Sequence, residues 1–148
     1  MKTINLHTIK RSACIVLIAL CTTTIMQSCG TSKYNFSTSS VVPAAEGSVK
    51  VKKDGNNNYK IELDVVRLAE ANRLNPPRQM YIVWMATENN GRKNIGQLKT
   101  SSGFLSNTLK SSLNTVTAFK PTGFFITAED DANIQYPGGQ TVLETSNF

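Results

Sequence analysis

Apolar residues are distributed along this chain in two different ways. Residues 13–26 form one nearly continuous apolar run, whereas from Glu46 onward apolar and polar residues alternate in short runs such as VKVKK and YKIELDVV. Alternation with a period of two is typical of a β-strand that has one buried and one solvent-facing side. The chain from Glu46 onward is therefore predicted to be β-structure.

Eight runs rich in strand-forming residues follow one another from Glu46, separated by Gly, Pro, Asn and Ser at intervals of about ten residues. The run MYIVWMA is apolar on both sides, which is typical of a central strand covered on both faces. Short strands without a long helix predict an all-β fold, a sandwich of about seven to eight strands over residues 46–148. One alternative stays open, an amphipathic helix through FLSNTLKSSL, where three leucines stand at helical spacing.

The first residues have the order of a bacterial lipoprotein signal peptide. Lys2, Lys10 and Arg11 precede the apolar run, and the residues MQSC follow it. An apolar run of about 14 residues is shorter than the roughly 20 that a spanning helix needs, so cleavage is predicted. MQSC resembles a lipobox, the motif at which the lipoprotein signal peptidase cuts before a cysteine. Residues 1–28 are therefore expected to be removed, and Cys29 is expected to become the lipidated first residue.

Cysteine suits this position because its thiolate can take a diacylglyceryl group through a thioether. Two or three acyl chains then hold a protein on a membrane effectively permanently. The alternative is that Cys29 is an ordinary thiol. Residues 29–45 are rich in Ser, Thr and small side chains and are predicted to be a flexible tether between the lipid and the sandwich. No acidic cluster follows Cys29, which favours a periplasm-facing position.

The charge balance moves toward neutral once the predicted leader is set aside. The chain has 16 basic and 10 acidic residues, a net charge of +6, and three basic residues precede Cys29, which leaves 13 and a net charge of +3. Nucleic-acid binding needs clustered Lys and Arg, so no nucleic-acid partner is expected. Lys50, Lys52 and Lys53 are interpreted as the solvent face of a sheet-edge strand, with contact to anionic lipid headgroups as the alternative.

The residue types most used in catalysis are nearly missing from the predicted mature chain. The single histidine, His7, and two of the three cysteines, Cys14 and Cys21, lie in the leader. A Ser-His-Asp triad, a His or Cys metal cluster and an internal disulfide are therefore excluded, because Cys29 is the one cysteine left. No cofactor is expected, and the protein is expected not to be an enzyme.

Two features remain as candidate sites. Glu129, Asp130 and Asp131 are the one dense group of carboxylates. Adjacent carboxylates can bind a hard cation or act as acid and base, although a solvated loop explains them equally. Trp84, the only tryptophan, is interpreted as a core aromatic that holds the two layers together, with stacking on a small ligand as the alternative. No catalytic residue and no further metal ligand is assigned.

Several strand and turn residues resemble those of one known family. They are Tyr81, Trp84, Gly96, Leu98, Ile126, Thr127, Glu129, Pro137, Gly138, Gly139, Val142 and Leu143. The pattern resembles the extracytoplasmic C-terminal domain of RskA-type anti-sigma factors over roughly residues 46–146. In that family a Tyr-x-x-Trp strand precedes a turn and a Gly-Gln/Val-Leu strand, and a Thr-x-Glu strand end precedes a Gly/Pro-rich loop. The resemblance implies an immunoglobulin-like (Ig-like) antiparallel sandwich without catalytic residues.

Sigma-factor binding is not expected, because the helical domain and spanning helix that precede this module in the family have no counterpart here. The sequence therefore predicts a lipid-anchored, non-enzymatic binding or structural module of the bacterial cell envelope. It is expected to contact another envelope protein through a sheet edge or an end loop. The alternatives are an ion-dependent or enzymatic module that uses the Glu129–Asp131 loop and a small-ligand binder near Trp84.

Overall fold

The computed structural model describes residues 30–103 and 106–148 of the 148-residue chain. The predicted signal peptide and Cys29 lie outside the described residues. The elements are β1 (Thr31–Asn35), β2 (Glu46–Lys53), β3 (Tyr59–Val66), the short 3-10 helix η1 (Ala71–Arg73), β4 (Met80–Thr87), β5 (Gly91–Gln97), β6 (Lys99–Gly103), β7 (Ser106–Thr117), β8 (Pro121–Glu129) and β9 (Thr141–Glu144). In the two described ranges no helix is long and apolar enough to cross a membrane.

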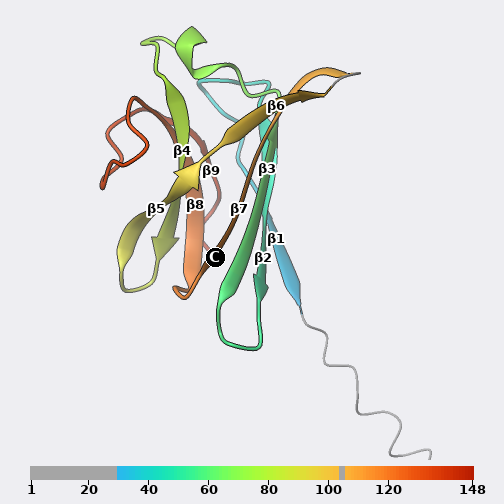
Figure 1. Ribbon diagram of the computed structural model, residues 1–148, viewed down its shortest axis with the longest axis vertical. Helices are drawn as coiled ribbons and strands as arrows, with labels where there is room; N and C mark the ends of the chain where they lie inside the picture. Colours follow the sequence, from blue (N-terminus) through green and yellow to red (C-terminus); the bar gives the residue numbers. More distant parts are fainter. Residues whose placement is uncertain (1–29, 104–105) are drawn as a thin grey trace, which may run out of the picture.

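The strands form two antiparallel sheets that pack face to face (Figure 1). The five-stranded sheet has the order β1-β2-β3-β7-β6, and the four-stranded sheet has the order β5-β4-β8-β9. The series β2-β3-β7-β6 corresponds to strands A-B-E-D of the immunoglobulin fold, and β5-β4-β8-β9 corresponds to C′-C-F-G. The predicted all-β, Ig-like sandwich is therefore confirmed, and the eight strands β2 to β9 lie in residues 46–148.

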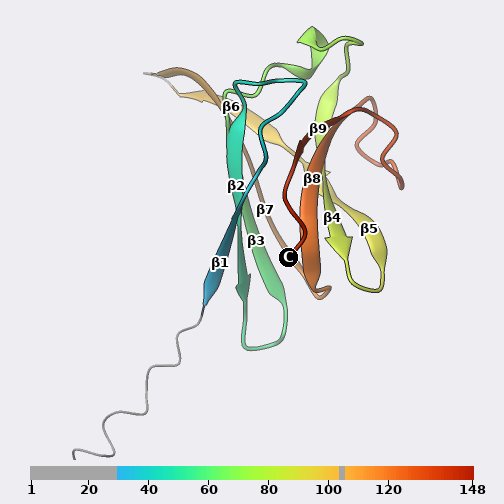
Figure 2. The same cartoon turned by 180° about the vertical axis from the view of Figure 1, so that it is seen from behind.

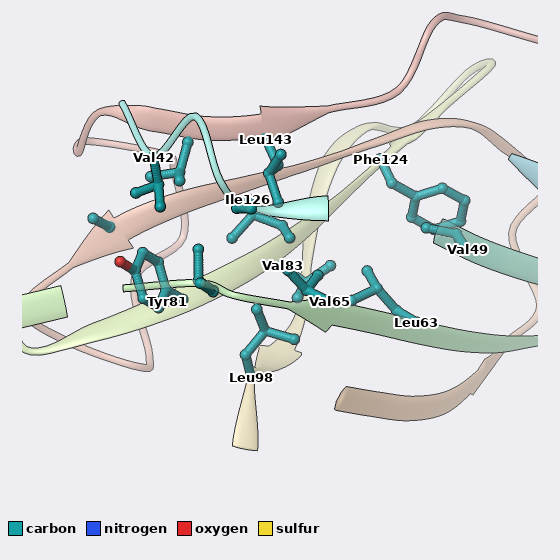
Figure 3. Packing of buried hydrophobic residues seen from close by; sticks show 14 of the residues in the cluster. Val42, Val49, Leu63, Val65, Tyr81, Val83, Leu98, Phe124, Ile126 and Leu143 are labelled. Atoms are coloured by element: carbon teal, nitrogen blue, oxygen red, sulfur yellow. The ribbon is translucent and has the colours of Figure 1, made fainter. Parts of the chain in front are cut away.

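Alternate residues of both sheets fill the space between them (Figure 3). On β3, Ile61, Leu63 and Val65 are at most 1% exposed, whereas Lys60 and Asp64 on the other side of the strand are exposed to solvent. Further members of this core are Val49, Val51, Tyr81, Val83, Met85, Leu98, Phe124, Ile126, Ala128, Val142 and Leu143. Each fully buried Val, Leu, Ile or Phe contributes about 1.5–3 kcal/mol, so the period of two decides which face of each strand turns inward.

Residues 31–45 are part of the sandwich, so the prediction of a flexible tether is wrong for this segment. β1 pairs with β2 along its whole length, and Phe36 then forms a bridge with Thr145 beside β9. The segment therefore crosses from the edge of one sheet to the edge of the other. The reason is an alternation of Tyr34 and Phe36, which pack against the core, within a stretch whose Ser and Thr content resembles a linker.

The chain also crosses between the sheets inside the run KNIGQLKTS, one of the eight runs that were each predicted to be a strand. Gly96 has a φ of +133°, a value that a residue with a Cβ rarely adopts, and the strand pairing shifts beside it. Leu98 then turns into the core and is 4% exposed. The run is thereby divided into β5 and β6. The helix considered for FLSNTLKSSL is wrong, because Ser106–Thr117 form the long strand β7.

The two ends of the sandwich carry different connections (Figures 1 and 2). At the end that we call the anchor end, β1 begins at Thr31 beside Lys52, and the β2–β3, β4–β5 and β7–β8 turns lie there. At the opposite, distal end lie the β3–β4 connection (residues 67–79) and the start of the β8–β9 loop (residues 130–140). The sandwich therefore has an anchor end, where β1 begins, and a distal end, where the β8–β9 loop begins.

Candidate functional site

The outward face of the four-stranded sheet, the face turned away from the other sheet, is partly covered by the β8–β9 loop. Tyr81, Val83 and Met85 of β4 point into the core between the sheets, so Trp84 lies on the outward face. Trp84 is nevertheless 0% exposed. Asn94 of β5, which pairs with Trp84, donates its side-chain amide to the carbonyl oxygens of Ala132 (2.9 Å) and Ile134 (3.1 Å) in the loop. The loop therefore lies over the tryptophan.

A chain of hydrogen bonds, buried where it begins on the sheet, links Trp84 to this loop. The indole Nε1–H donates to Thr127 Oγ1 (2.8 Å), and the Thr127 hydroxyl donates to Glu129 Oε1 (2.7 Å). The same carboxylate oxygen accepts the backbone N–H groups of Gly138 (3.1 Å) and Gly139 (3.0 Å). We call these five residues the Trp84–Glu129 network. Because a carboxylate forms stronger hydrogen bonds than a neutral acceptor, the network holds the end of the loop against the sheet.

The three predicted carboxylates have three different partners. Glu129 is 5% exposed and belongs to the network, whereas Asp130 forms an ion pair with Arg78 in the β3–β4 connection (2.5 Å). Asp131 accepts the backbone N–H of Asn133 within the loop (2.9 Å). In the part of the chain that the structure describes, no three His, Cys, Asp or Glu residues are placed to share a metal ion. The consecutive acids therefore do not form a common site in this arrangement.

Trp84 has a different role from the one expected. It is buried, as a core aromatic should be, but it holds a loop onto one sheet and does not hold the two sheets together. Its ring is stacked on Phe125 of β8 with the centroids 6.1 Å apart and 11° between the planes. Since the ring exposes no surface and its N–H already has an acceptor, no face of it is open to a ligand.

The accessible site on this side of the molecule is an open groove between β5 and the β8–β9 loop. The groove has a volume of about 1050 Å³ and is lined by residues 90–96 and 132–137. Asn133, Gln135 and Arg92 give it hydrogen-bonding groups, and Tyr136 at 83% exposure is the most exposed large apolar side chain among the described residues. None of the lining residues is an acid, a histidine or a cysteine, so the groove offers cationic, amide and aromatic groups to a binding partner.

The β3–β4 connection beside this site is also held by a buried group. The Tyr81 hydroxyl donates to the carbonyl oxygen of Ala69 (2.8 Å), and burial raises the pKa of Tyr81 to about 12. Tyr81 is therefore neutral at every physiological pH. The backbone N–H of Gln79 donates to the Glu129 carbonyl oxygen (3.1 Å), so this connection and the β8–β9 loop are joined at their bases.

Comparison with protein-family models, with curated protein sequences and with solved structures gives no match. The residues that carry the resemblance to RskA-type domains include all five members of the Trp84–Glu129 network. The resemblance therefore rests on residues that build the fold, and membership of that family stays a prediction. The sequence did not indicate the groove, because it forms only where the β8–β9 loop folds back beside β5.

Gly139→Ala is expected to lower the free energy of unfolding by about 1–3 kcal/mol, in the range of overpacked positions. A Cβ at Gly139 would stand 1.8 Å from the carbonyl oxygen of Ala128, which is backbone and must move. Gly138→Ala is the matched control, because its Cβ would meet Glu129 Oε2 at 3.8 Å, an ordinary contact. Urea unfolding of both variants measures the difference. Equal stability of the two would contradict the close packing of the loop.

Proposed function

We propose that this chain is a lipid-anchored, non-enzymatic binding module of the bacterial cell envelope that contacts another envelope protein through the groove and the β8–β9 loop. The observation that supports it best is the polarity of the sandwich relative to Cys29. β1 begins at Thr31, two residues after Cys29, and lies at the end opposite to the start of the β8–β9 loop. A lipid on Cys29 would therefore direct the distal end away from the membrane.

The short distance between lipid and fold supports a module that is held close to the surface. Two residues span at most about 7 Å, so Thr31 would lie directly at the headgroups. The strand β3 has eight residues, which corresponds to roughly 27 Å along the sandwich. The distal connections would then be presented roughly that far above the membrane, within reach of a periplasmic partner.

The position of the β8–β9 loop, one wall of the groove, agrees with the way that Ig-like sandwiches bind. In antibody variable domains the B–C and F–G loops at one end carry the binding residues, and this comparison is an analogy of fold alone. The corresponding connections here are residues 67–79 and the β8–β9 loop, which the ion pair between Arg78 and Asp130 joins. The loop is fixed before any partner arrives, so binding costs little conformational entropy.

The two alternative functions receive less support from the geometry. An ion-dependent or enzymatic site at Glu129–Asp131 would need carboxylates that point to one place, and these three have separate partners. A small-ligand site at Trp84 would need an exposed ring, and Trp84 is 0% exposed.

Photo-cross-linking in cells of the source organism tests the proposal. A photoreactive residue placed at Tyr136 is expected to capture one envelope protein, and the same residue at the exposed Asn56 of the β2–β3 turn is the control that should not. The captured protein, once purified, is expected to bind Tyr136→Ser at least about tenfold more weakly than the unaltered protein, as for an aromatic residue at the centre of an interface.

The same preparations test the anchor. The intact mass of the membrane-extracted protein is expected to equal the chain from Cys29 plus its acyl groups, and Cys29→Ala is expected to leave the membrane fraction. A free Cys29 thiol in that species would overturn the lipid anchor.

In the cross-linking experiment, capture of the same proteins from Tyr136 and Asn56 would overturn the groove as the contact surface.

A further inference from the structure

Four lysines form a compact cluster on the outward face of the five-stranded sheet, at its anchor end. Lys33 of β1 lies opposite Lys50 of β2, and Lys52 of β2 lies opposite Lys60 of β3. All four are exposed. Adjacent strands are about 5 Å apart and two successive outward residues about 7 Å, so each lysine has its neighbours in the cluster within about one Debye length, about 8 Å. We call these residues the anchor-end lysines.

One acid lies within this cluster. Glu62, opposite Lys50 on β3, forms an ion pair with Lys60 at 2.7 Å. The hydrogen bond from Lys60 lowers the pKa of Glu62 below its ordinary value, and the charges of Lys60, Lys50 and Lys52 lower it further. Four lysines and one ionised glutamate leave a local net charge of +3.

The net positive charge disappears along the same strands toward the distal end, where Glu46 forms an ion pair with Arg67. The next outward residue of β3 is Asp64, opposite Ser48, and Glu46 follows on β2. Lysine is therefore concentrated in the half of this face that lies nearest to Cys29, while two of the three acids on β2 and β3, Glu46 and Asp64, lie farther away. A solvated face without a partner gives no reason for this separation.

Protection of a sheet edge does not explain the cluster. β1 covers β2, so Lys50 and Lys52 lie on an interior strand, and the interpretation of β2 as an edge strand is wrong. Like charges directly opposite one another on neighbouring strands destabilise a sheet. The pairs Lys33–Lys50 and Lys52–Lys60 therefore cost stability, which points to a role outside the fold.

Two exposed apolar side chains lie at the anchor end, one of them beside the lysines. Val116 of β7 is opposite Lys60 and is 60% exposed. Phe119, in the β7–β8 turn at the same end, is 39% exposed and lies against Lys93 of β5, on the other sheet. Basic groups next to exposed apolar groups suit the boundary between phosphate headgroups and acyl chains.

We propose that the anchor-end lysines rest on the anionic headgroups of the membrane that holds the lipid on Cys29. The inference rests on the proposed function, which supplies the anchor two residues before Thr31. Contact through the anchor end of this face tilts the sandwich, so that the distal end still points away from the membrane and the four-stranded sheet, which carries the groove, faces away from it. The domain is thereby held in one orientation in which a periplasmic partner reaches the groove.

Lysine acylation on vesicles tests the contact. The membrane-extracted full protein is reconstituted into vesicles of phosphatidylcholine alone or of an equal mixture with phosphatidylglycerol, treated with a water-soluble acylating reagent, and digested for mass spectrometry. We expect the acylation rates of Lys33, Lys50, Lys52 and Lys60 to fall at least about fivefold on the anionic vesicles, the factor for one lysine near such a surface. High salt should abolish the difference.

Lys110 is the internal control, because it lies on β7 opposite Val66, toward the distal end of the same sheet. Its acylation rate should be the same on both vesicles. Lys33→Gln combined with Lys50→Gln should remove the protection of Lys52 and Lys60, whereas Lys110→Gln should preserve it.

The outcomes separate this inference from the proposed function. Equal rates on both vesicles in a protein whose mass shows the lipid would overturn the membrane contact and leave the anchor standing. Protection that appears only when other envelope proteins are added would overturn it in favour of an acidic protein partner. An unmodified Cys29 would overturn both.

Discussion

Trp84→Ala is expected to lower the free energy of unfolding by about 3–5 kcal/mol, the range for truncating a buried aromatic side chain. Trp84 is 0% exposed, so the change removes the whole ring from beneath the β8–β9 loop and leaves a cavity against Phe125. It also removes the indole N–H that donates a hydrogen bond to Thr127 Oγ1. Urea unfolding followed by far-ultraviolet circular dichroism measures the loss, because the variant has no tryptophan fluorescence.

Trp84→Phe and Tyr136→Ala are the matched controls for this prediction. Trp84→Phe keeps an aromatic ring but loses the indole N–H, so it should lower the free energy of unfolding by about 1–2 kcal/mol. Tyr136 is 83% exposed, so Tyr136→Ala should change stability by less than about 0.5 kcal/mol. If Trp84→Ala were as stable as Tyr136→Ala, the tryptophan would not be buried in solution, and ligand stacking would again be open.

The alternation of apolar residues predicted most of the sandwich because strands such as β2 and β3 have one buried and one solvent-facing side. Ile61, Leu63 and Val65 show this directly. The same signal was present in Tyr34 and Phe36, but two residues are too short a pattern to stand out from a Ser/Thr-rich stretch. Boundaries also depend on residues distant in sequence, as where Leu98 turns into the core to separate β5 from β6.

The candidate site was harder to predict because its burial comes from a loop. MYIVWMA is apolar on both faces, so the sequence indicates that both sides of β4 are covered without indicating what covers each. Trp84 was assigned to the inter-sheet core for this reason. The acids were treated as a cluster since they are consecutive, yet the alternation of Phe125, Thr127 and Glu129 along β8 already places Glu129 on the side of Trp84.

The division of roles among the three acids leads to the second large effect. Glu129→Ala is expected to lower the free energy of unfolding by about 2–5 kcal/mol, because it leaves the buried Thr127 hydroxyl and the partly buried N–H groups of Gly138 and Gly139 without their acceptor. Asp130→Ala breaks an ion pair whose carboxylate is half exposed, and such pairs contribute about 0–1 kcal/mol. Asp131→Ala removes one exposed turn contact.

Thermal and urea unfolding of the three variants, each with and without added calcium, distinguishes this role from ion binding. If the acids only stabilise the loop, Glu129→Ala is the one alanine variant that is strongly destabilised, and calcium changes none of the unfolding midpoints. Glu129→Gln is then intermediate in stability because it keeps one acceptor oxygen. In the ion-dependent alternative the unaltered protein would gain stability with calcium, and Asp130→Ala and Asp131→Ala would lose that gain. Such a gain would support the acidic loop as the functional site in place of the groove.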